Sequence, residues 1–347
     1  MKLADNNPLQ RTRVAVVIPV YNDEKTLSKC LEALAPSRAN PNWEFIVVDD
    51  NSSDDSARVA SEAEFKVIRL ERNQGVSAAR NAGARNTNSD ILIFVDADIV
   101  PEPGCLEAMV EILENRREIH AVGAYPLPVN LSPEWSSHFV GLRSAWGYHW
   151  NEGERERKFS SIQSECGAIR REIFHLLGGF SERYEGVGME EFHMAHEIED
   201  QGLGHLLIKS AAYRHHYKPL FPRSRALIDR TARWVPLLRK RKKFESNGAV
   251  GTATAALSCV LTYLWIVLGI LSPVAICLLF FSAAIFIGQL MLEARFLAFV
   301  RKMNGWWMML YSVGALQILH LSIGLGFMIG VFKMLIWGEE QRRGGSK

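Results

Sequence analysis

The sequence predicts an α/β domain with a parallel, doubly wound sheet, followed by a C-terminal α-helical transmembrane region. In the first hundred residues, short apolar runs alternate with segments of helical spacing, which is the pattern of strand–helix–strand units. After Gly248, uncharged apolar residues continue for long enough to cross a membrane. The expected boundaries are 1–222 for the α/β domain, 223–246 for a basic amphipathic interfacial helix, 247–337 for membrane helices and 338–347 for a basic tail.

Four short apolar runs are expected to form the strands of the sheet. The fourth, Ile91 to Val95, has no polar residue, which is typical of a strand buried on both faces. The expected strands, in order, are residues 14–18, 44–48, 65–70 and 91–95, and the expected helices between them are residues 27–34, 56–63 and 76–86. From Pro101 to about Tyr217 the pattern is mixed, with Gly-rich turns between short elements.

Polar residues follow the ends of these strands, where open α/β sheets bind ligands. Asp96 and Asp98 come directly after the fourth strand, and on an extended chain their side chains point the same way. Paired carboxylates suit Mg²⁺ or Mn²⁺, which proteins commonly hold together with substrate phosphates. The alternative is that two aspartates merely end a strand in a turn.

Composition excludes several classes of protein. The formal net charge is +2, so no overall charge bias calls for a nucleic-acid partner. The five cysteines are widely spaced and form no Cys-x-x-Cys pair, which argues against a disulfide framework or a zinc site and favours a reducing compartment. The first twelve residues are polar, so we expect no cleavable signal peptide.

The C-terminal third carries the membrane signal. Residues 223–244 are basic and amphipathic, and five cations, Arg239 to Lys243, precede about 45 uncharged residues that fit two membrane spans at about 248–292. The positive-inside rule places the cations and the charged break at 293–304 in the cytoplasm. The apolar stretch 306–337 is open to two interpretations, a third span or a re-entrant hairpin.

Several of these stretches, taken together, resemble glycosyltransferase family 2, the inverting nucleotide-sugar enzymes with the GT-A fold. The residues that carry the resemblance are Ile18-Pro19-Val20-Tyr21-Asn22, Val47-Val48-Asp49-Asp50-Asn51-Ser52-Ser53, Asn73-Gln74-Gly75 with Ala79-Arg80-Asn81, and Asp96-Ala97-Asp98. Their order and spacing over residues 14–100 are highly specific, and the resemblance continues more loosely to about residue 220.

The resemblance implies a donor site for a nucleotide sugar, and a UDP-sugar is the expected donor. It assigns Pro19, Tyr21 and Asn22 to the nucleotide, and it has Asp50 accept a hydrogen bond from the base. It makes Asp98 the metal ligand, with Asp96 on the metal or the ribose. Two assignments have structural alternatives: Asp49 to Ser52 also suit a helix cap or turn, and Arg80 also suits a solvated helix face, although the resemblance places it near the nucleotide.

An inverting transferase needs a general base beside the acceptor hydroxyl. The family usually supplies it as the aspartate of a Glu-Asp pair that opens a helix, and this chain has Glu190-Glu191 instead. We expect Glu191 to be the base, with Glu190 positioning the acceptor, while two acids at a helix N-terminus are the structural alternative. His193, His215 and His216 could approach the metal, but we assign them no role.

The segment Arg230-Thr231-Ala232-Arg233-Trp234 resembles the (Gln/Arg)-x-x-Arg-Trp motif of membrane members of the family, including ceramide glucosyltransferases. The resemblance implies that Trp234 lies near the acceptor and Arg233 near the diphosphate. The alternative is an interfacial helix whose cations meet anionic lipid headgroups.

These observations lead to three hypotheses for the function. The first is an inverting, metal-dependent glycosyltransferase of the cytoplasmic membrane, with its catalytic domain in the cytoplasm, that transfers sugar to a lipid-linked or glycolipid acceptor. The second is a polyprenyl-phosphate glycosyltransferase that makes a lipid-activated sugar. The third is an inactive membrane scaffold or glycan-binding subunit. The expected partners are the donor, the lipid acceptor and membrane lipids, and an oligomer is possible.

Overall fold

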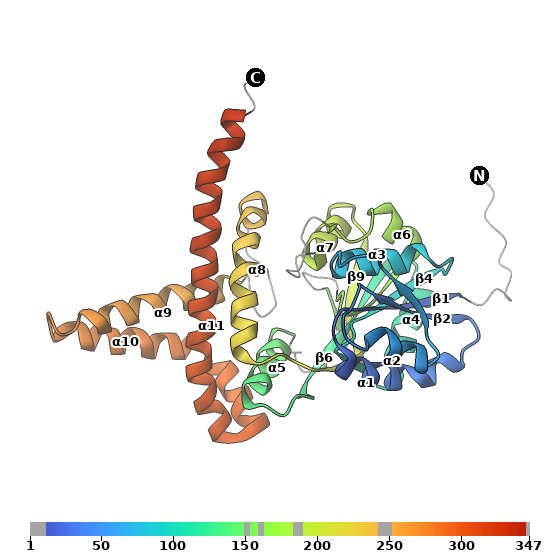
Figure 1. The fold of residues 1–347 in the computed structure, drawn as a ribbon. Coiled ribbons are helices and arrows are strands. Elements are labelled where there is room, and N and C mark those ends of the chain that lie inside the picture. Colours follow the sequence, from blue (N-terminus) through green and yellow to red (C-terminus); the bar gives the residue numbers. More distant parts are fainter. Residues whose placement is uncertain (1–11, 149–152, 159–162, 183–189, 242–251, 345–347) are drawn as a thin grey trace. The chain divides into compact units, whose positions relative to one another are not determined.

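A computed structural model describes residues 12–148, 153–158, 163–182, 190–241 and 252–344. The chain divides into two compact units (Figure 1). The first comprises residues 1–127 and 150–216, and the second comprises residues 128–149 and 217–347. Residues 128–149 therefore group with the C-terminal helices, although the sequence placed them within the α/β domain.

A mixed sheet forms the centre of the first unit. Its strands follow the order β3-β2-β1-β4-β8-β6-β9-β5, and β7 pairs with β9. Neighbours among the first four are parallel, whereas β8 is antiparallel to β4. The strands are β1 (Val14–Val20), β2 (Trp43–Asp49), β3 (Lys66–Arg69), β4 (Ile91–Val95), β5 (Ile99–Pro101), β6 (Ile119–Asn130), β7 (Glu156–Arg157), β8 (Cys166–Arg170) and β9 (Gly204–His215).

Helices cover both faces of this sheet (Figure 1). Alternate side chains of β1 enter opposite cores: Val16 and Ile18 pack on one face, and Ala15 and Val17 pack on the other. The first face carries α1 (Glu24–Leu34), α2 (Ser56–Glu62) and α4 (Cys105–Asn115), and the second carries α3 (Val76–Arg85), α6 (Arg171–Leu176) and α7 (Glu190–Asp200). A short 3₁₀ helix, η1 (Ala35–Ala39), follows α1.

The predicted α/β class and the four parallel strands are therefore confirmed. The second half of the sheet is largely antiparallel. The sequence did not show this, because β5, β7 and β8 have five residues or fewer and polar residues or prolines interrupt the apolar pattern of β6 and β9.

The second unit is helical. It contains α5 (Trp135–Gly147), α8 (Leu220–Arg241), α9 (Ala253–Leu271), α10 (Cys277–Leu292) and α11 (Ala294–Gly344). By length and composition, α9 and residues 294–336 of α11 are candidate membrane spans, and α10 is a shorter apolar helix. Gly305, at φ 79°, kinks α11. Residues 306–336 then continue as one helix, in which the structure has no turn of a re-entrant hairpin.

Candidate active site

The loops after β1 and β2 are joined by side-chain hydrogen bonds. Asn22 stands in the left-handed region at φ 51°, and its Oδ1 accepts the backbone N–H of Ser53 at 2.7 Å. The backbone N–H of Asn22 in turn donates to Ser52 Oγ at 3.0 Å. Tyr21, beside them, is half exposed, and Pro19 is buried in β1. The residues expected to bind the nucleotide thus belong to two loops that these hydrogen bonds hold rigidly together, with the exposed ring of Tyr21 beside them.

Asp50 fixes a third loop against this pair. Its two carboxylate oxygens accept the backbone N–H groups of Gln74 and Gly75, each at 2.8 Å, and its side chain is buried. Burial raises the pKa of Asp50, and the two backbone N–H donors oppose that rise. Gly75 has φ 87°, a conformation that glycine adopts without strain, and α3 begins directly after it. Asp50 therefore holds the turn that opens α3, and contact with a base remains a prediction.

Replacing Asp50 with asparagine is expected to destabilise the protein by about 1–3 kcal/mol, because one of the two buried N–H groups would face an amide NH₂. The measurement is the change in unfolding free energy of the full chain in detergent. Asp55→Asn is the matched control, since the ion pair of Asp55 with Arg58 is exposed and should contribute less than about 1 kcal/mol. Equal changes in the two variants would contradict this role for Asp50.

Arg80 projects from α3 to the end of β4. Its Nη2 donates to both carboxylate oxygens of Asp96, at 2.7 and 2.9 Å, and its guanidinium lies 5.3 Å from the centre of the Phe180 ring. Only 2% of the Arg80 side chain is exposed, so the alternative of a solvated helix face is wrong. Burial raises the pKa of Asp96 to about 6, with the Asp98 and Glu165 carboxylates adding to the rise and Arg80 opposing it.

Asp98 meets a histidine from the neighbouring strand. His215 Nε2 lies 3.1 Å from Asp98 Oδ2, because β5 pairs with β9 and places Ile99 opposite His215. The backbone N–H of His216 donates to the carbonyl of Asp98 at 2.9 Å. Asp96 and Asp98 are each a quarter exposed, so both carboxylates reach solvent.

These residues fit a divalent ion that is shared with a ligand. Among the described residues, no group of three or more His, Cys, Asp or Glu side chains is arranged to hold a metal by itself. The donor set is two partly exposed carboxylates with an imidazole beside one of them. Mg²⁺ and Mn²⁺ are suited to such sites because they take few protein ligands and complete their shells with water and phosphate.

Asn81 connects α3 to the segment that leads to α7. Its amide donates to the Phe180 carbonyl at 2.8 Å and accepts the Phe180 N–H at 2.9 Å. Glu190 and Glu191 are the first two residues of α7, as the sequence predicted for the acidic pair, but their side chains lie outside the described residues. His193 pairs with Glu197 one turn along the helix, at 3.9 Å.

Arg233 and Trp234 belong to α8 in the second unit. Arg233 is exposed and Trp234 is half-buried. Their expected roles at the diphosphate and the acceptor stay predictions.

The structure adds residues that the sequence did not indicate. The Glu165 carbonyl accepts the N–H of Asp96 at 2.9 Å, and the Glu165 carboxylate accepts the Tyr213 hydroxyl. His215 had been considered and left without a role. Its distance of 117 residues from Asp98 along the chain hid the contact, which only the pairing of β5 with β9 creates.

The comparisons with known proteins agree with this geometry. The model of the family "Glycosyl transferase family 2" matches residues 15–177. A dolichol-phosphate mannosyltransferase of Pyrococcus furiosus is 29% identical over 116 residues, which cover 32% of this chain and 33% of that protein. An undecaprenyl-phosphate 4-deoxy-4-formamido-L-arabinose transferase of Proteus mirabilis is 36% identical over 115 residues, which cover 31% of this chain and 35% of that protein. Two further relatives are named only as glycosyltransferases.

The aligned stretches span 17% to 45% of the length of these curated relatives. Among solved structures, a mannosyltransferase of Pyrobaculum calidifontis in complex with GDP-Man and Mn²⁺ superposes with a TM-score of 0.55 at 19% identity. The match covers 94% of this chain and 88% of that one, so the likeness in fold includes both units. The family model thus accounts for residues 15–177, and the likeness to the solved mannosyltransferase is one of the GT-A fold.

Proposed function

We propose that the chain transfers a sugar from a nucleotide sugar to the phosphate of a membrane-embedded polyprenyl phosphate. The observation that carries this choice of acceptor is the kind of relative that the N-terminal domain matches, since two of them act on dolichol or undecaprenyl phosphate by name. The chain joins that domain to apolar helices, as an enzyme with a lipid acceptor requires. Of the hypotheses drawn from the sequence, this is the second, and the relatives favour it over the first.

Asp98 and Asp96 would hold a Mn²⁺ or Mg²⁺ ion together with the donor diphosphate. Such an ion offsets the negative charge that grows on the leaving nucleoside diphosphate. Arg80 keeps the Asp96 carboxylate in place and ionised, and the loops fixed by Asn22 and Asp50 would take the nucleotide. We propose that the reaction takes place at the cytoplasmic membrane face, in accordance with the cations before the apolar helices.

A phosphate acceptor changes what the acidic pair at α7 has to do. A sugar hydroxyl must lose a proton as it attacks, so it needs a general base. A phosphate monoester carries a charge of about −1.5 to −2 at pH 7 and is already a nucleophile. Under this proposal Glu190 and Glu191 position the acceptor or stabilise the helix, and proton removal is not required of them.

Glu191→Gln is therefore expected to keep the transfer rate to polyprenyl phosphate within about tenfold of the unchanged chain, because glutamine retains size and hydrogen bonding. The measurement is kcat for nucleoside diphosphate release with the lipid phosphate present, with Glu190→Gln as the matched control. A fall of about 10²- to 10⁴-fold in Glu191→Gln would contradict this proposal and would support Glu191 as a base, as the sequence predicted.

The second candidate is transfer from a UDP-sugar to a glycolipid or lipid-linked glycan. What favours it is the acidic pair at the start of α7, where a base for a hydroxyl acceptor is expected. Purified full-length chain would be incubated with UDP- and GDP-sugars, Mn²⁺ and either lipid, and the products analysed by mass spectrometry. A sugar linked to the lipid phosphate supports the proposal, and a lengthened glycan supports the second candidate. If no donor gave turnover, the remaining hypothesis would be the inactive membrane scaffold.

A further inference from the structure

The last half of α11 packs closely and in parallel against α8. A Cβ atom added at Gly326 would lie 2.4 Å from the carbonyl oxygen of Ile228, and one added at Gly330 would lie 2.5 Å from that of Ala232. Both contact points advance by four residues, so the two helices run in the same direction. Small residues at this spacing let helix backbones approach closely. Because the two helices are in contact, α8 lies within one helix diameter of whatever surrounds this part of α11, water or lipid.

The charges on α8 exclude it from the hydrocarbon core. Its exposed residues include five charged ones, at positions 223, 225, 229, 233 and 239. Each charged side chain costs about 2.5–3.5 kcal/mol at the centre of a membrane helix. If α11 crossed the bilayer along its axis, α8 would accompany it at the depth of Gly326 and Gly330. The summed free-energy cost of placing the charged side chains of α8 in the hydrocarbon core excludes an α11 that crosses the bilayer.

The face of α11 that points away from α8 is apolar. Five of its exposed apolar residues recur at spacings of three and four, which places them on one side of the helix: Leu325, Met328, Phe332, Leu335 and Ile336. Phe327, which is also exposed, lies on the flank. On the helical projection this stripe lies opposite Gly326 and Gly330, and the exposed cation Lys333 lies on the α8 side. Together, α8 with its charges and α11 with its apolar stripe form a pair of helices that is polar on one side and apolar on the other, which suits the surface of a bilayer.

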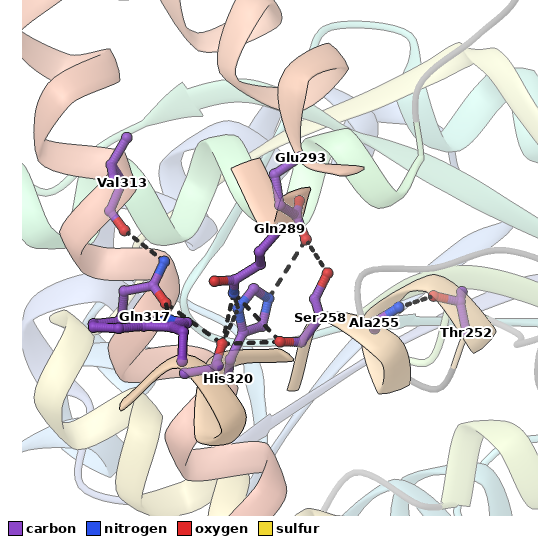
Figure 2. Close-up of polar contacts among 10 residues, drawn as sticks. Thr252, Ala255, Ser258, Gln289, Glu293, Val313, Gln317 and His320 are labelled. Carbon is purple, nitrogen blue, oxygen red and sulfur yellow. Dashed lines mark hydrogen bonds and ion pairs between the residues drawn. The ribbon is translucent and has the colours of Figure 1, made fainter. Parts of the chain in front are cut away.

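The helices α9 and α10 form a hairpin that packs against the middle of α11 (Figure 1). Figure 2 shows the buried polar contacts that join them. The Glu293 carboxylate accepts Ser258 Oγ at 3.0 Å and lies 3.5 Å from His320 Nε2. Gln289 Nε2 lies 2.9 Å from His320 Nδ1, and the Tyr263 hydroxyl donates to the Leu321 carbonyl at 2.7 Å. These contacts use the first half of α9 and the end of α10, so they mark the root of the hairpin.

The tip of the hairpin is apolar. Val274 is 84% exposed and Ile276 is 68% exposed, and residues 253–292 contain no charged side chain. The hairpin helices therefore carry apolar side chains outward from the root to the tip, as an element surrounded by lipid requires.

We propose that the hairpin of α9 and α10 is the part that enters the bilayer, and that α11 does not cross it. Instead, α11 lies along the bilayer surface beside α8, with the face from Leu325 to Ile336 against the lipid chains. The C-terminus is then on the same side of the membrane as the N-terminal domain. This places the basic tail where the positive-inside rule expects it, without a third span. The inference concerns the membrane contact and does not depend on the reaction.

The depth of three positions on one face of α11 tests this directly. Spin labels would be attached to full-length Leu325→Cys, Phe332→Cys and Ile336→Cys in a Cys277→Ser background, since Cys277 is exposed and the other four cysteines are buried. In vesicles of phosphatidylcholine and phosphatidylglycerol, the three labels are expected at equal depth by oxygen and nickel accessibility. A helix crossing the membrane would separate the outer two by about 16 Å, at 1.5 Å per residue, and that gradient would overturn the proposal.

The side on which the tail lies gives an independent test. Arg343→Cys would be compared with Glu62→Cys, an exposed position of the N-terminal domain, in sealed inverted vesicles treated with a membrane-impermeant maleimide. We expect both variants to be labelled from the same side. Val274→Cys, at the hairpin tip, is expected to resist labelling from that side. Labelling of Arg343→Cys only from the side opposite to Glu62→Cys would show that α11 crosses.

Discussion

Replacing Asp98 with alanine is expected to lower the rate of sugar transfer by on the order of 10³-fold while leaving the fold intact. Asp98 is a quarter exposed and its carboxylate is paired with His215, so its removal leaves no fully buried charge unpaired. Under the proposed function, the variant loses one oxygen ligand of the metal ion in a site that has few protein ligands to offer. The measurements are nucleoside diphosphate release at saturating donor and the affinity for Mn²⁺ in the presence of the nucleotide.

Asp90→Ala is the matched control, because the pair of Asp90 with Arg13 is exposed on both sides. It should keep the transfer rate within about twofold, since surface ion pairs contribute little. Thermal unfolding should place both variants close to the unchanged chain. Near-normal turnover of Asp98→Ala with divalent ions chelated would show that these carboxylates do not hold a catalytic ion.

The sequence was sufficient for the parallel half of the sheet, because β1, β2 and β4 each contain a continuous apolar run followed by polar residues. The run from Ile91 to Val95 and the strand found there coincide. The antiparallel half was not predictable in the same way: β7 has two residues, and β9 includes His205, Lys209 and Arg214, which break the apolar pattern. Its strands are specified by pairing with distant neighbours rather than by local composition.

The candidate site shows the same difference between residues that local sequence predicts and residues that only the tertiary structure brings together. Local motifs predicted Asp96, Asp98 and the loop residue Asn22, because each lies at a strand end. The partners of the two aspartates come from other elements, Arg80 from α3 and His215 from β9, so their pairing is a property of the tertiary structure. A motif alone could not decide whether Arg80 was solvated or buried, since the exposure of a helix face depends on what packs against it.

The membrane region shows the limit of composition as evidence. Residues 306–336 are long and apolar enough to span a bilayer, and the sequence left open only whether they form a third span or a re-entrant hairpin. The close approach of Gly326 and Gly330 to a charged helix is visible only in the structure.

Arg80→Ala is expected to have an effect comparable to the loss of Asp98, by way of Asp96. The guanidinium is buried and lowers the pKa of a carboxyl that burial and its acidic neighbours have raised to about 6. Without it, that pKa should rise further, so that a larger share of Asp96 is protonated at pH 7 and cannot serve as the negatively charged ligand that the proposed function requires. Breaking a buried pair also costs about 3 kcal/mol of stability.

The pH profile separates these two consequences. The acid limb of the transfer rate should move to higher pH in Arg80→Ala, and activity should partly recover in alkaline buffer as Asp96 ionises again. A folded-state pKa above the usual value for a carboxyl means that ionising Asp96 costs stability, so the variant should also unfold more easily as pH rises through that pKa. Arg80→Lys keeps a charge but not the planar guanidinium, and its acid limb should lie between those of Arg80→Ala and the unchanged chain. An unshifted acid limb in Arg80→Ala, with Tm lowered, would show that Arg80 supports the fold and does not control the charge of Asp96.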